Sequence, residues 1–498
     1  MKATETFLAQ QEALYEKRRQ EILQAKDSIE ITGTTYYVSA DGDDANDGKS
    51  PETAWKTLLR VNEAEFLPGD GVRFRRGDLF RGTVDTRQKP GVTYCAYGEG
   101  PKPRFYGWDE DLADTGLWEE TDAEHHIWKY RKPIVDPGTL VFNHGEKHSR
   151  KLIPTFKNMK FVCRDDENRD FVMAEEMTED LDIFWKFADR FTTEPSKGED
   201  FPIPVTGPDC YGELWLRCDS GNPGAVFSSI EAVARRVAFW VSRAHNITVD
   251  NLCMKYYCFG VSAGTTEGLH VTNCEIGWIG GNIQCYDGTD PNFPQGKRGT
   301  VTRFGNGIEV YGGCRDYRVE NCWIYQSYDA GASHQVNTSI KVLMKDVLYK
   351  DNLIEACVYA IEYFVDMRDG ETESMMDGIV MCGNILRNSG YGWGQQRHNK
   401  DTPALIKGWS YPNPARNFAV YGNIFDRCAY RMIHTVATDA ESCPDMHDNV
   451  YIQDLGGCLG RYGGNRLQEP EDLVFDENAE ETVEKVLRDR NAKVYVIG

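Results

Sequence analysis

One short phrase recurs along the second half of the chain and limits the folds that it can form: an alternating apolar stretch, then Asn, then further apolar residues. The asparagines of its copies are Asn251, Asn273, Asn321, Asn352, Asn384, Asn423 and Asn449. The intervals between them range from 22 to 48 residues, and the longest divides into 26 and 22 if Gly299 fills one asparagine position. Periods of this size indicate a solenoid, in which each repeat forms one coil.

The residues within each repeat favour a β-coil over a pair of helices. The apolar stretches are short, rich in β-branched side chains and flanked by Gly and Asn, whereas an α-solenoid needs amphipathic segments of helix length. In a parallel β-helix the coils stack about 4.8 Å apart, so a residue type that recurs at one position forms a ladder. Asn suits such a position because it tolerates a left-handed turn and its amide can bond along the stack. The sequence therefore predicts an all-β parallel β-helix.

Shifts in composition predict five segments. Residues 1–30 form a helix that covers an open end of the solenoid, and residues 31–104 form the opening and first coils. Residues 105–230, with five tryptophans among acidic stretches and no recurring spacing, form an inserted lobe. Residues 231–465 form the β-helix core, and residues 466–498 form an acidic C-terminal segment whose charge run is typical of a solvated face.

Charge and hydropathy exclude two classes of partner. The 498 residues include 56 Lys and Arg against 78 Asp and Glu, a formal charge of −22, and no basic stripe stands out. Nucleic acid is therefore not expected as a partner. No apolar run approaches the ~18 residues that span a bilayer, so no membrane partner is expected. The first thirty residues lack the apolar region of a secretory signal, which predicts a cytoplasmic protein.

The fifteen cysteines favour reduced thiols. Their number is odd, and none belongs to paired Cys-x-x-Cys motifs or to a Cys and His pattern at zinc spacing. The acidic loop 41–48 lacks the alternating acids, the placed Gly and the closing Glu of an EF-hand. We predict no metal site and no cofactor. The sequence leaves open whether the chain forms a homo-oligomer.

The repeat frame places three carboxyl groups on one outer face of the coils. With Ala330 and Ile361 pointing inward, strand alternation turns Asp329, Glu309 and Glu362 outward on neighbouring rungs. Glu309 and Glu362 then share a column two rungs apart, about 9.6 Å. Asp329 is expected one rung from each glutamate and displaced by two residues along the strand direction. Its Cα atom would then lie about 8 Å from the Cα atom of each glutamate.

Carboxyl groups at such separations suit glycoside hydrolysis, which uses pairs about 5–5.5 Å apart when retaining and about 6.5–9.5 Å apart when inverting. One carboxyl must carry a proton for the leaving oxygen while the other is ionised, and a cluster of like charges separates pKa values in that way. We expect Glu362 as the general acid/base and Asp329 as the nucleophile or water-activating base, although these two roles could be exchanged. Glu309 would tune their protonation or hold a sugar hydroxyl.

Aromatic and hydrogen-bonding residues are concentrated in the same part of the chain. Flat rings pack against the apolar faces of pyranoses, and polar side chains supply directional hydrogen bonds, so a carbohydrate is the expected partner. The predicted substrate-binding residues are Trp278, Tyr286, Tyr328, His334, Trp393, Arg397, Trp409 and His434. The long connections 281–304 and 390–414 are expected to rise as loops that wall a cleft.

Several motifs resemble those of a known superfamily. Residues 36–42 (YYVSADG), 50–58 (SPETAWKTL) and 212–223, which contain GELWLR and GNP, look like bacterial right-handed parallel β-helix enzymes of the pectate-lyase-like superfamily. The phrases NGIE at 306–309 and YDAG at 328–331 resemble its glycoside hydrolase branch, which includes α-L-fucosidases and β-xylosidases. The resemblance covers roughly residues 35–465. It implies a right-handed coil, glycan chemistry and paired acids, and the matching positions are Asp329 and Glu362.

Two other functions are compatible with this fold. A polysaccharide lyase would need a basic residue, for which Arg397, Lys407 and Arg431 are available, and Ca²⁺ to neutralise a uronate. A strongly acidic chain repels polyuronates unless its cleft is locally basic. A non-catalytic glycan-binding β-helix would show aromatic platforms without an acid pair. The chain lacks the Asn-Thr-Asp, Gly-His-Gly and Arg-Ile-Lys phrases of polygalacturonases. We predict a glycoside hydrolase that acts on oligosaccharides or small glycosides.

Overall fold

The protein is mostly β-structure. The computed structural model describes residues 1–157, 160–163, 169–187, 201–202, 210–286, 301–397, 403–408, 413–435, 437, 439–463 and 472–498. Strands make up 48% of the structure, and helices make up 13%. None of the helices in these ranges combines the length and the apolar character that a bilayer crossing requires.

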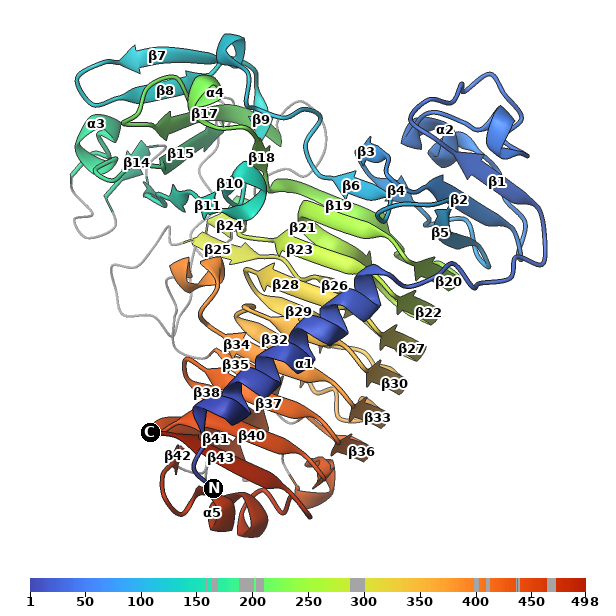
Figure 1. Cartoon of the computed structure of the whole chain (residues 1–498), viewed down its shortest axis with the longest axis vertical. Helices are drawn as coiled ribbons and strands as arrows, with labels where there is room; N and C mark the ends of the chain where they lie inside the picture. Colours follow the sequence, from blue (N-terminus) through green and yellow to red (C-terminus); the bar gives the residue numbers. More distant parts are fainter. Residues whose placement is uncertain are drawn as a thin grey trace.

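The solenoid has three faces, and successive coils contribute one strand to each (Figure 1). The first face contains β1 (Thr35–Val38), β2 (Gly71–Arg75), β5 (Thr93–Tyr97), β20 (His245–Asp250), β22 (Thr266–Thr272), β27 (Cys314–Glu320), β30 (Leu343–Lys350), β33 (Met375–Cys382), β36 (Ala415–Tyr421) and β39 (Asp445–His447). The second face contains β3 (Leu79–Arg81), β6 (Arg104–Tyr106), β23 (Glu275–Ile279), β28 (Trp323–Ser327), β31 (Leu353–Glu355), β34 (Ile385–Ser389), β37 (Ile424–Cys428), β40 (Val450–Asp454) and β43 (Lys493–Ile497).

The third face carries the residues of greatest interest. It contains β4 (Val84–Asp85), β19 (Ala234–Trp240), β26 (Ile308–Tyr311), β29 (Ala330–Thr338), β32 (Tyr359–Met367), β35 (Ala404–Gly408), β38 (Arg431–Thr435) and β41 (Gly457–Tyr462). The long strand β21 (Cys253–Ala263) belongs to two faces, because residues 253–257 pair with β23 and residues 261–263 pair with β26. Successive coils pair in parallel, which confirms the predicted all-β parallel β-helix.

The prediction of an additional coil near Gly299 is wrong. β22 pairs directly with β27, with His270 opposite Arg318, so the 48-residue interval is a single coil. The extra length leaves the solenoid as the antiparallel hairpin of β24 (Asn282–Tyr286) and β25 (Val301–Phe304). Gly299 itself lies outside the described residues. Interval length alone does not distinguish two short coils from one coil with an excursion.

The recurring asparagines form two neighbouring columns instead of one. Asn251, Asn273 and Asn321 occupy a corner column with positive φ, which Asp351, Gly383, Gly422 and Asp448 continue. The buried residues Asn352, Asn384, Asn423 and Asn449 lie one residue later and bond to one another in a chain. The corner column uses both properties that favour Asn, because Asn321 has a positive φ and its amide also donates to Asn273 at 2.6 Å, whereas the buried column uses the bonding amide.

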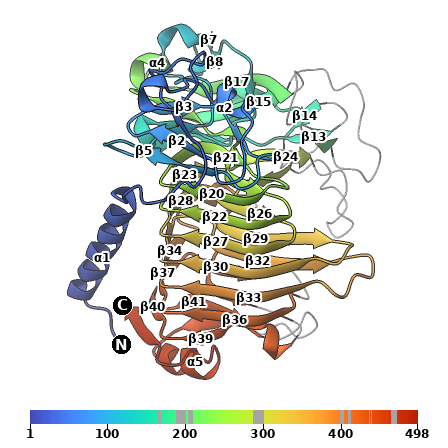
Figure 2. The same cartoon turned by 90° about the vertical axis from the view of Figure 1, so that its right-hand side faces the viewer.

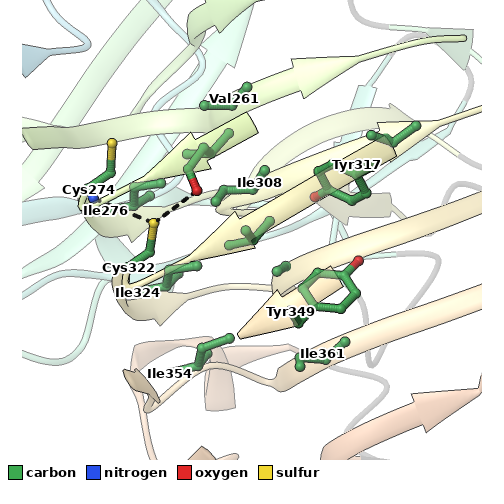
Figure 3. Close-up of a cluster of buried hydrophobic side chains, with 14 of the residues drawn as sticks. Val261, Cys274, Ile276, Ile308, Tyr317, Cys322, Ile324, Tyr349, Ile354 and Ile361 are labelled. Carbon is green, nitrogen blue, oxygen red and sulfur yellow. Dashed lines mark hydrogen bonds between the residues drawn. The ribbon is translucent and has the colours of Figure 1, made fainter. Parts of the chain in front are cut away.

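On the coils that precede Asn352, two cysteines occupy the same inward-facing position as the buried asparagines. Cys274 and Cys322 stand on neighbouring coils and pack among isoleucines of the core, among them Ile276 and Ile324 (Figure 3). The backbone N–H of Cys322 donates to the side-chain oxygen of Asn352, 2.9 Å away, which joins the two parts of the column. All fourteen cysteines whose side chains the structure describes are free thiols, as the odd cysteine count suggested.

The N-terminal helix α1 (Glu5–Leu23) is present but does not cover an end of the solenoid. It runs along the second face, across several coils (Figures 1 and 2). Tyr15 and Ile22 are buried against the coils, and Glu12 forms an ion pair with Arg387 at 2.7 Å. The last coil is instead covered by α5 (Ala479–Lys485), whose Val483 joins the core. The sequence predicted the helix, but not the part of the solenoid that it covers.

Between β6 and β19 the chain leaves the solenoid and forms a lobe (Figure 1). Its strands are β7 (Trp118–Asp122), β8 (Ile127–Tyr130), β9 (Ile134–Val135), β10 (Leu140–Phe142), β11 (Lys147–His148), β12 (Arg150–Lys151), β13 (Thr155–Lys157), β14 (Lys160–Val162), β15 (Asp182–Phe187), β17 (Tyr211–Arg217) and β18 (Ile230–Ala232), and β16 (Phe201–Pro202) pairs with β24. Short helices α3 (Met173–Glu176) and α4 (Pro223–Val226) lie within the lobe, and α2 (Leu58–Glu63) follows β1. The lobe has its own apolar core, which includes Trp118, Trp185 and Leu214.

The asparagine chain should contribute measurably to stability. Asn384 donates to the carbonyl of Tyr349 at 3.0 Å and to Asn423, and it accepts from the amide of Asn352. We expect Asn384→Ala to lower the free energy of unfolding by about 2–4 kcal/mol, because it leaves several buried polar groups without partners. Urea denaturation measures this. The matched control Asn478→Ala removes an exposed asparagine with no capping bond and should change stability by less than about 0.5 kcal/mol.

Candidate active site

A polar column runs along the outside of the third face. Strand register places Ser262, Glu309, Ser333, Glu362, Lys407, His434 and Arg461 on successive rungs. The preceding position on each rung belongs to the core and holds Ile308, Ala332, Ile361, Ile406 and Ile433. Strand alternation therefore turns the polar column outward. Glu309 and Glu362 lie two rungs apart, about 9.6 Å, which is the register expected from the sequence.

Asp329 lies elsewhere than predicted. It precedes β29 by one residue and Ser333 by four, at the corner between the second and third faces. Ala330 pairs with Tyr359, not with Ile361. One residue of this error comes from treating Asn321 and Asn352 as equivalent, although they occupy adjacent columns. The other comes from the corner that follows: the chain advances four residues from Glu355 to Tyr359, but five from Tyr325 to Ala330, with which these residues are in register.

An arginine holds Asp329 at this corner. The Nη1 atom of Arg397 donates to Oδ1 of Asp329 at 2.5 Å, and both side chains are mostly buried. The short helical turn Trp393–Gln396 positions this arginine. Its guanidinium also lies over the rings of Tyr328 and Tyr359, at 5.9 and 5.6 Å from the ring centres. The segment that follows β34 thus carries the cationic partner of Asp329.

Burial and the nearby charge of Asp329 raise the pKa values of the two glutamates. The pKa of Glu362 is raised to about 8, by burial first and then by the charge of Asp329, while Arg397 and Lys407 act in the opposite direction. Burial raises the pKa of Glu309 to about 7, against the hydrogen bonds that it accepts from Asn306 at 2.6 Å and Gln335 at 2.9 Å. Because Asp329 affects both glutamates, the three carboxyl groups form one cluster.

The far end of the column is basic. Arg431 and Arg461 both donate to Oδ1 of Asp472, at 2.7 and 3.0 Å, and these bonds help to lower the pKa of Asp472 to about 2. His434 pairs in register with Lys407. Burial first, and then the charges of Lys407 and the two arginines, lower the pKa of His434 to about 2. The imidazole is therefore neutral at physiological pH, next to a group of cations.

His334 is not at the site, contrary to the prediction. It follows the outward Ser333 directly, so alternation turns it into the core, where its Nδ1 is 2.9 Å from the hydroxyl of Tyr349. Its ring stacks on Tyr363 with the centres 5.9 Å apart. Burial lowers the pKa of His334 to about 3, so the ring is neutral there. It is a structural histidine.

Three of the predicted sugar-stacking rings are internal. Trp278, Tyr328 and Trp393 are 6%, 0% and 1% exposed and form a cluster with Val141 of the lobe and Val233 between the lobe and β19. The indole N–H of Trp393 donates to the carbonyl of Gln326 at 2.7 Å. These rings attach the lobe to the coils and present no open face to a sugar. Their burial contradicts the role of exposed platforms.

The remaining predicted binding residues divide into two groups. Arg397 and His434 lie at the site, as described above. Tyr286 ends β24, but its side chain is not among those described, and Trp409 lies outside the described residues.

Two residues of the site, Asn306 and Ser333, were not predicted from the sequence. Position 333 could have been found from the column that joins positions 309 and 362. Within the described ranges, no group of His, Cys, Asp and Glu has the arrangement of a metal site.

Comparisons with known proteins find carbohydrate-active enzymes. No family model matches the chain. Over 92 residues the chain is 39% identical to a lacto-N-biosidase of Bifidobacterium longum subsp. longum, a match that spans 16% of this chain and only 6% of that relative. A GH136 lacto-N-biosidase structure from Eubacterium ramulus aligns with 99% of this chain and 70% of its own, at 12% identity and a TM-score of 0.32. An alginate lyase from Paenibacillus sp. str. FPU-7 aligns with 94% of this chain and 100% of its own, at 8% identity and a TM-score of 0.40.

The raised pKa of Glu362 makes stability depend on pH. Its folded pKa exceeds the ordinary value near 4.5, so the stability that its proton provides is complete below about pH 4.5 and is lost as the pH rises through about 8. We expect the unfolding free energy of the wild type, relative to Glu362→Gln, to fall by on the order of 3 kcal/mol between about pH 5 and about pH 8.5. Urea denaturation at several pH values measures this difference.

The matched control for this experiment is Glu267→Gln, which changes an exposed glutamate on the first face. Its stability should follow that of the wild type across the range. A constant difference between wild type and Glu362→Gln at all pH values would contradict the assignment of a buried, protonated carboxyl.

Proposed function

We propose that the protein is a carbohydrate-active enzyme and, more specifically, a glycoside hydrolase that acts on oligosaccharides or small glycosides through paired carboxyl groups. The observation that carries the proposal is the unequal environment of Glu362 and Asp329. Glu362 is 5% exposed with a pKa of about 8, whereas Asp329 pairs with the cation of Arg397. Glycosidic cleavage requires one carboxyl group that donates a proton and a second that acts at the anomeric carbon, and these unequal surroundings suit the two roles.

In this mechanism Glu362 donates its proton to the glycosidic oxygen while the bond from that oxygen to the anomeric carbon breaks. Asp329 acts on the opposite side of the sugar. It either attacks the anomeric carbon, and water later releases the sugar, or it takes a proton from a water that attacks directly. Asn306 and Gln335 hold Oε2 of Glu309, which leaves its other oxygen for a sugar hydroxyl. No step needs a metal ion.

The basic end of the column favours polysaccharide lyase chemistry as a second candidate. Elimination from a uronate needs a base for the proton beside the carboxylate and cations to neutralise that carboxylate. Lys407 would supply this base and Arg431 a cation, because burial and these charges lower the pKa of His434 to about 2 and leave its imidazole too weak a base for the step. The hydrolase proposal includes the cytoplasmic location that the sequence predicts. Cell fractionation tests this location.

Leaving-group dependence separates the roles of the two acids. We expect Glu362→Gln to lower kcat/KM about 10²–10⁴-fold on alkyl glycosides and natural oligosaccharides, but much less on dinitrophenyl glycosides, whose leaving group needs no proton. Asp329→Asn should be impaired on both kinds of substrate, because it removes the group that acts at the anomeric carbon. Glu267→Gln serves as the control. Equal losses for Glu362→Gln on both substrate classes would rule out its role as proton donor.

A parallel assay distinguishes hydrolysis from elimination. Purified protein is incubated with neutral oligosaccharides and with polyuronates, with and without EDTA, while reducing sugar and the ultraviolet absorbance of unsaturated products are followed. The hydrolase proposal predicts new reducing ends without that absorbance, and no effect of EDTA. A rise in absorbance on polyuronates that Lys407→Met abolishes would establish the lyase instead.

A further inference from the structure

A second candidate binding site lies on the second face, on another side of the solenoid from the acid cluster. It is a pocket of about 780 Å³, within the range usual for small-molecule sites. The end of α1, the segment from Gly98 to Arg104 and three residues of β21 and β23 line it. Cys253, at the start of β21, borders this pocket, whereas Ser262, near the other end of the strand, pairs with Glu309. The two sites are therefore separated by a turn of the coil.

The pocket is basic in a strongly acidic protein. Its lining includes five cationic residues, Lys26, Arg76, Lys102, Arg104 and Lys255, against the three acids Asp27, Glu99 and Glu275. The chain as a whole carries a formal charge of −22. A local excess of positive charge attracts anions to the pocket that the rest of the surface repels.

Two of these cations are already neutralised by acids in the same wall. Arg76 donates to both carboxylate oxygens of Asp27, at 3.0 and 2.7 Å. Lys255 lies 2.6 Å from Glu275, which also accepts from the hydroxyl of Tyr325 at 3.0 Å. These pairs form a rigid polar wall whose carboxylates can still accept hydrogen bonds from hydroxyl groups.

Two further cations, the buried Lys102 and the half-buried Arg104, have neutral partners only. Lys102 is 3% exposed, and its Nζ donates to the amide oxygen of Asn251. Arg104 donates from Nη2 to the carbonyl of Gly77 at 2.9 Å, and its Nε is buried without a partner. Within the described part of the chain, neither has a carboxylate at ion-pair distance. A buried cation without an anion is costly, and a bound anion would offset that cost.

We propose that this pocket binds an anionic sugar, a uronate or a sugar phosphate, with its charged group against Lys102 and Arg104 and its hydroxyls against the wall formed by Glu275 and Asp27. This inference is independent of the proposed catalytic function and concerns binding alone. The occupant would also contact the segment Leu23–Asp27 and so fasten the end of α1 to the first coils.

Calorimetric titration of the full chain tests the proposal. The probes are D-glucuronate and glucose 6-phosphate, with D-glucose and inorganic phosphate as their uncharged and sugar-free counterparts. We expect at least one anionic sugar to bind tenfold or more tightly than glucose and than phosphate. The preferred anion then shows whether the pocket takes a uronate or a sugar phosphate. Equal affinity for glucose and the anionic sugars, or no binding of either anion, would overturn the proposal.

Variants locate the binding. Lys102→Met and Arg104→Gln should each weaken binding of the preferred anion at least tenfold, and two variants are needed because Lys102 is buried and its replacement could disturb folding. The matched control Lys89→Met alters another partly buried lysine, which donates to the carbonyls of Val61 and Asn62 outside the pocket, and should bind as the wild type does.

Binding should persist in the Glu362→Gln variant, which separates this site from the acid cluster. Loss of binding in Glu362→Gln with retention in a folded Arg104→Gln variant would assign the anion to the third face and refute the pocket. Catalytic failure of the proposed hydrolase would leave this result unaffected, because the titration measures no turnover.

Discussion

Parallel hydrogen bonding between successive coils is the constraint on which the rest of the structure depends. It places every residue directly above the equivalent residue of the preceding coil, so one choice of side chain is repeated along the molecule. The buried asparagines from Asn352 to Asn449 satisfy this constraint inside the solenoid, since each donates to the next. Where the chain provides Cys274 and Cys322 at this position, thiols take over the inward column.

The same stacking creates the chemistry of the third face. Stacking holds the outward groups of neighbouring rungs close together and partly buried, so their pKa values depend first on burial and then on the charges beside them. Burial and the charge of Asp329 raise the pKa values of Glu309 and Glu362 at one end of the column, whereas burial and the charge of Lys407 lower the pKa of His434 at the other. An acidic part and a basic part thus follow each other along a single line of residues. This order makes hydrolysis the leading proposal and elimination the second.

Much of the fold was predictable because it rests on a local repeat. The β-branched stretches and the spaced asparagines indicated a parallel β-helix, and the alternation around Ile308 and Ile361 placed Glu309 and Glu362 in one column. The coil attributed to Gly299 and the register of Asp329 were wrong, because corner lengths and excursions vary without changing the repeat. The aromatic residues misled for a different reason: Trp278 and Trp393 attach a lobe whose position no periodicity reveals.

The sequence by itself determined the architecture and one pair of acids, since both follow from patterns repeated within each coil. Only the tertiary structure decided which groups face each other across coils and elements: the ion pair of Asp329 with Arg397, the burial of His334, and the placement of α1 along the second face. These contacts join residues far apart in the chain. Their formation depends on the lengths of corners and loops, which set where a side chain ends up and leave no periodic trace in the sequence.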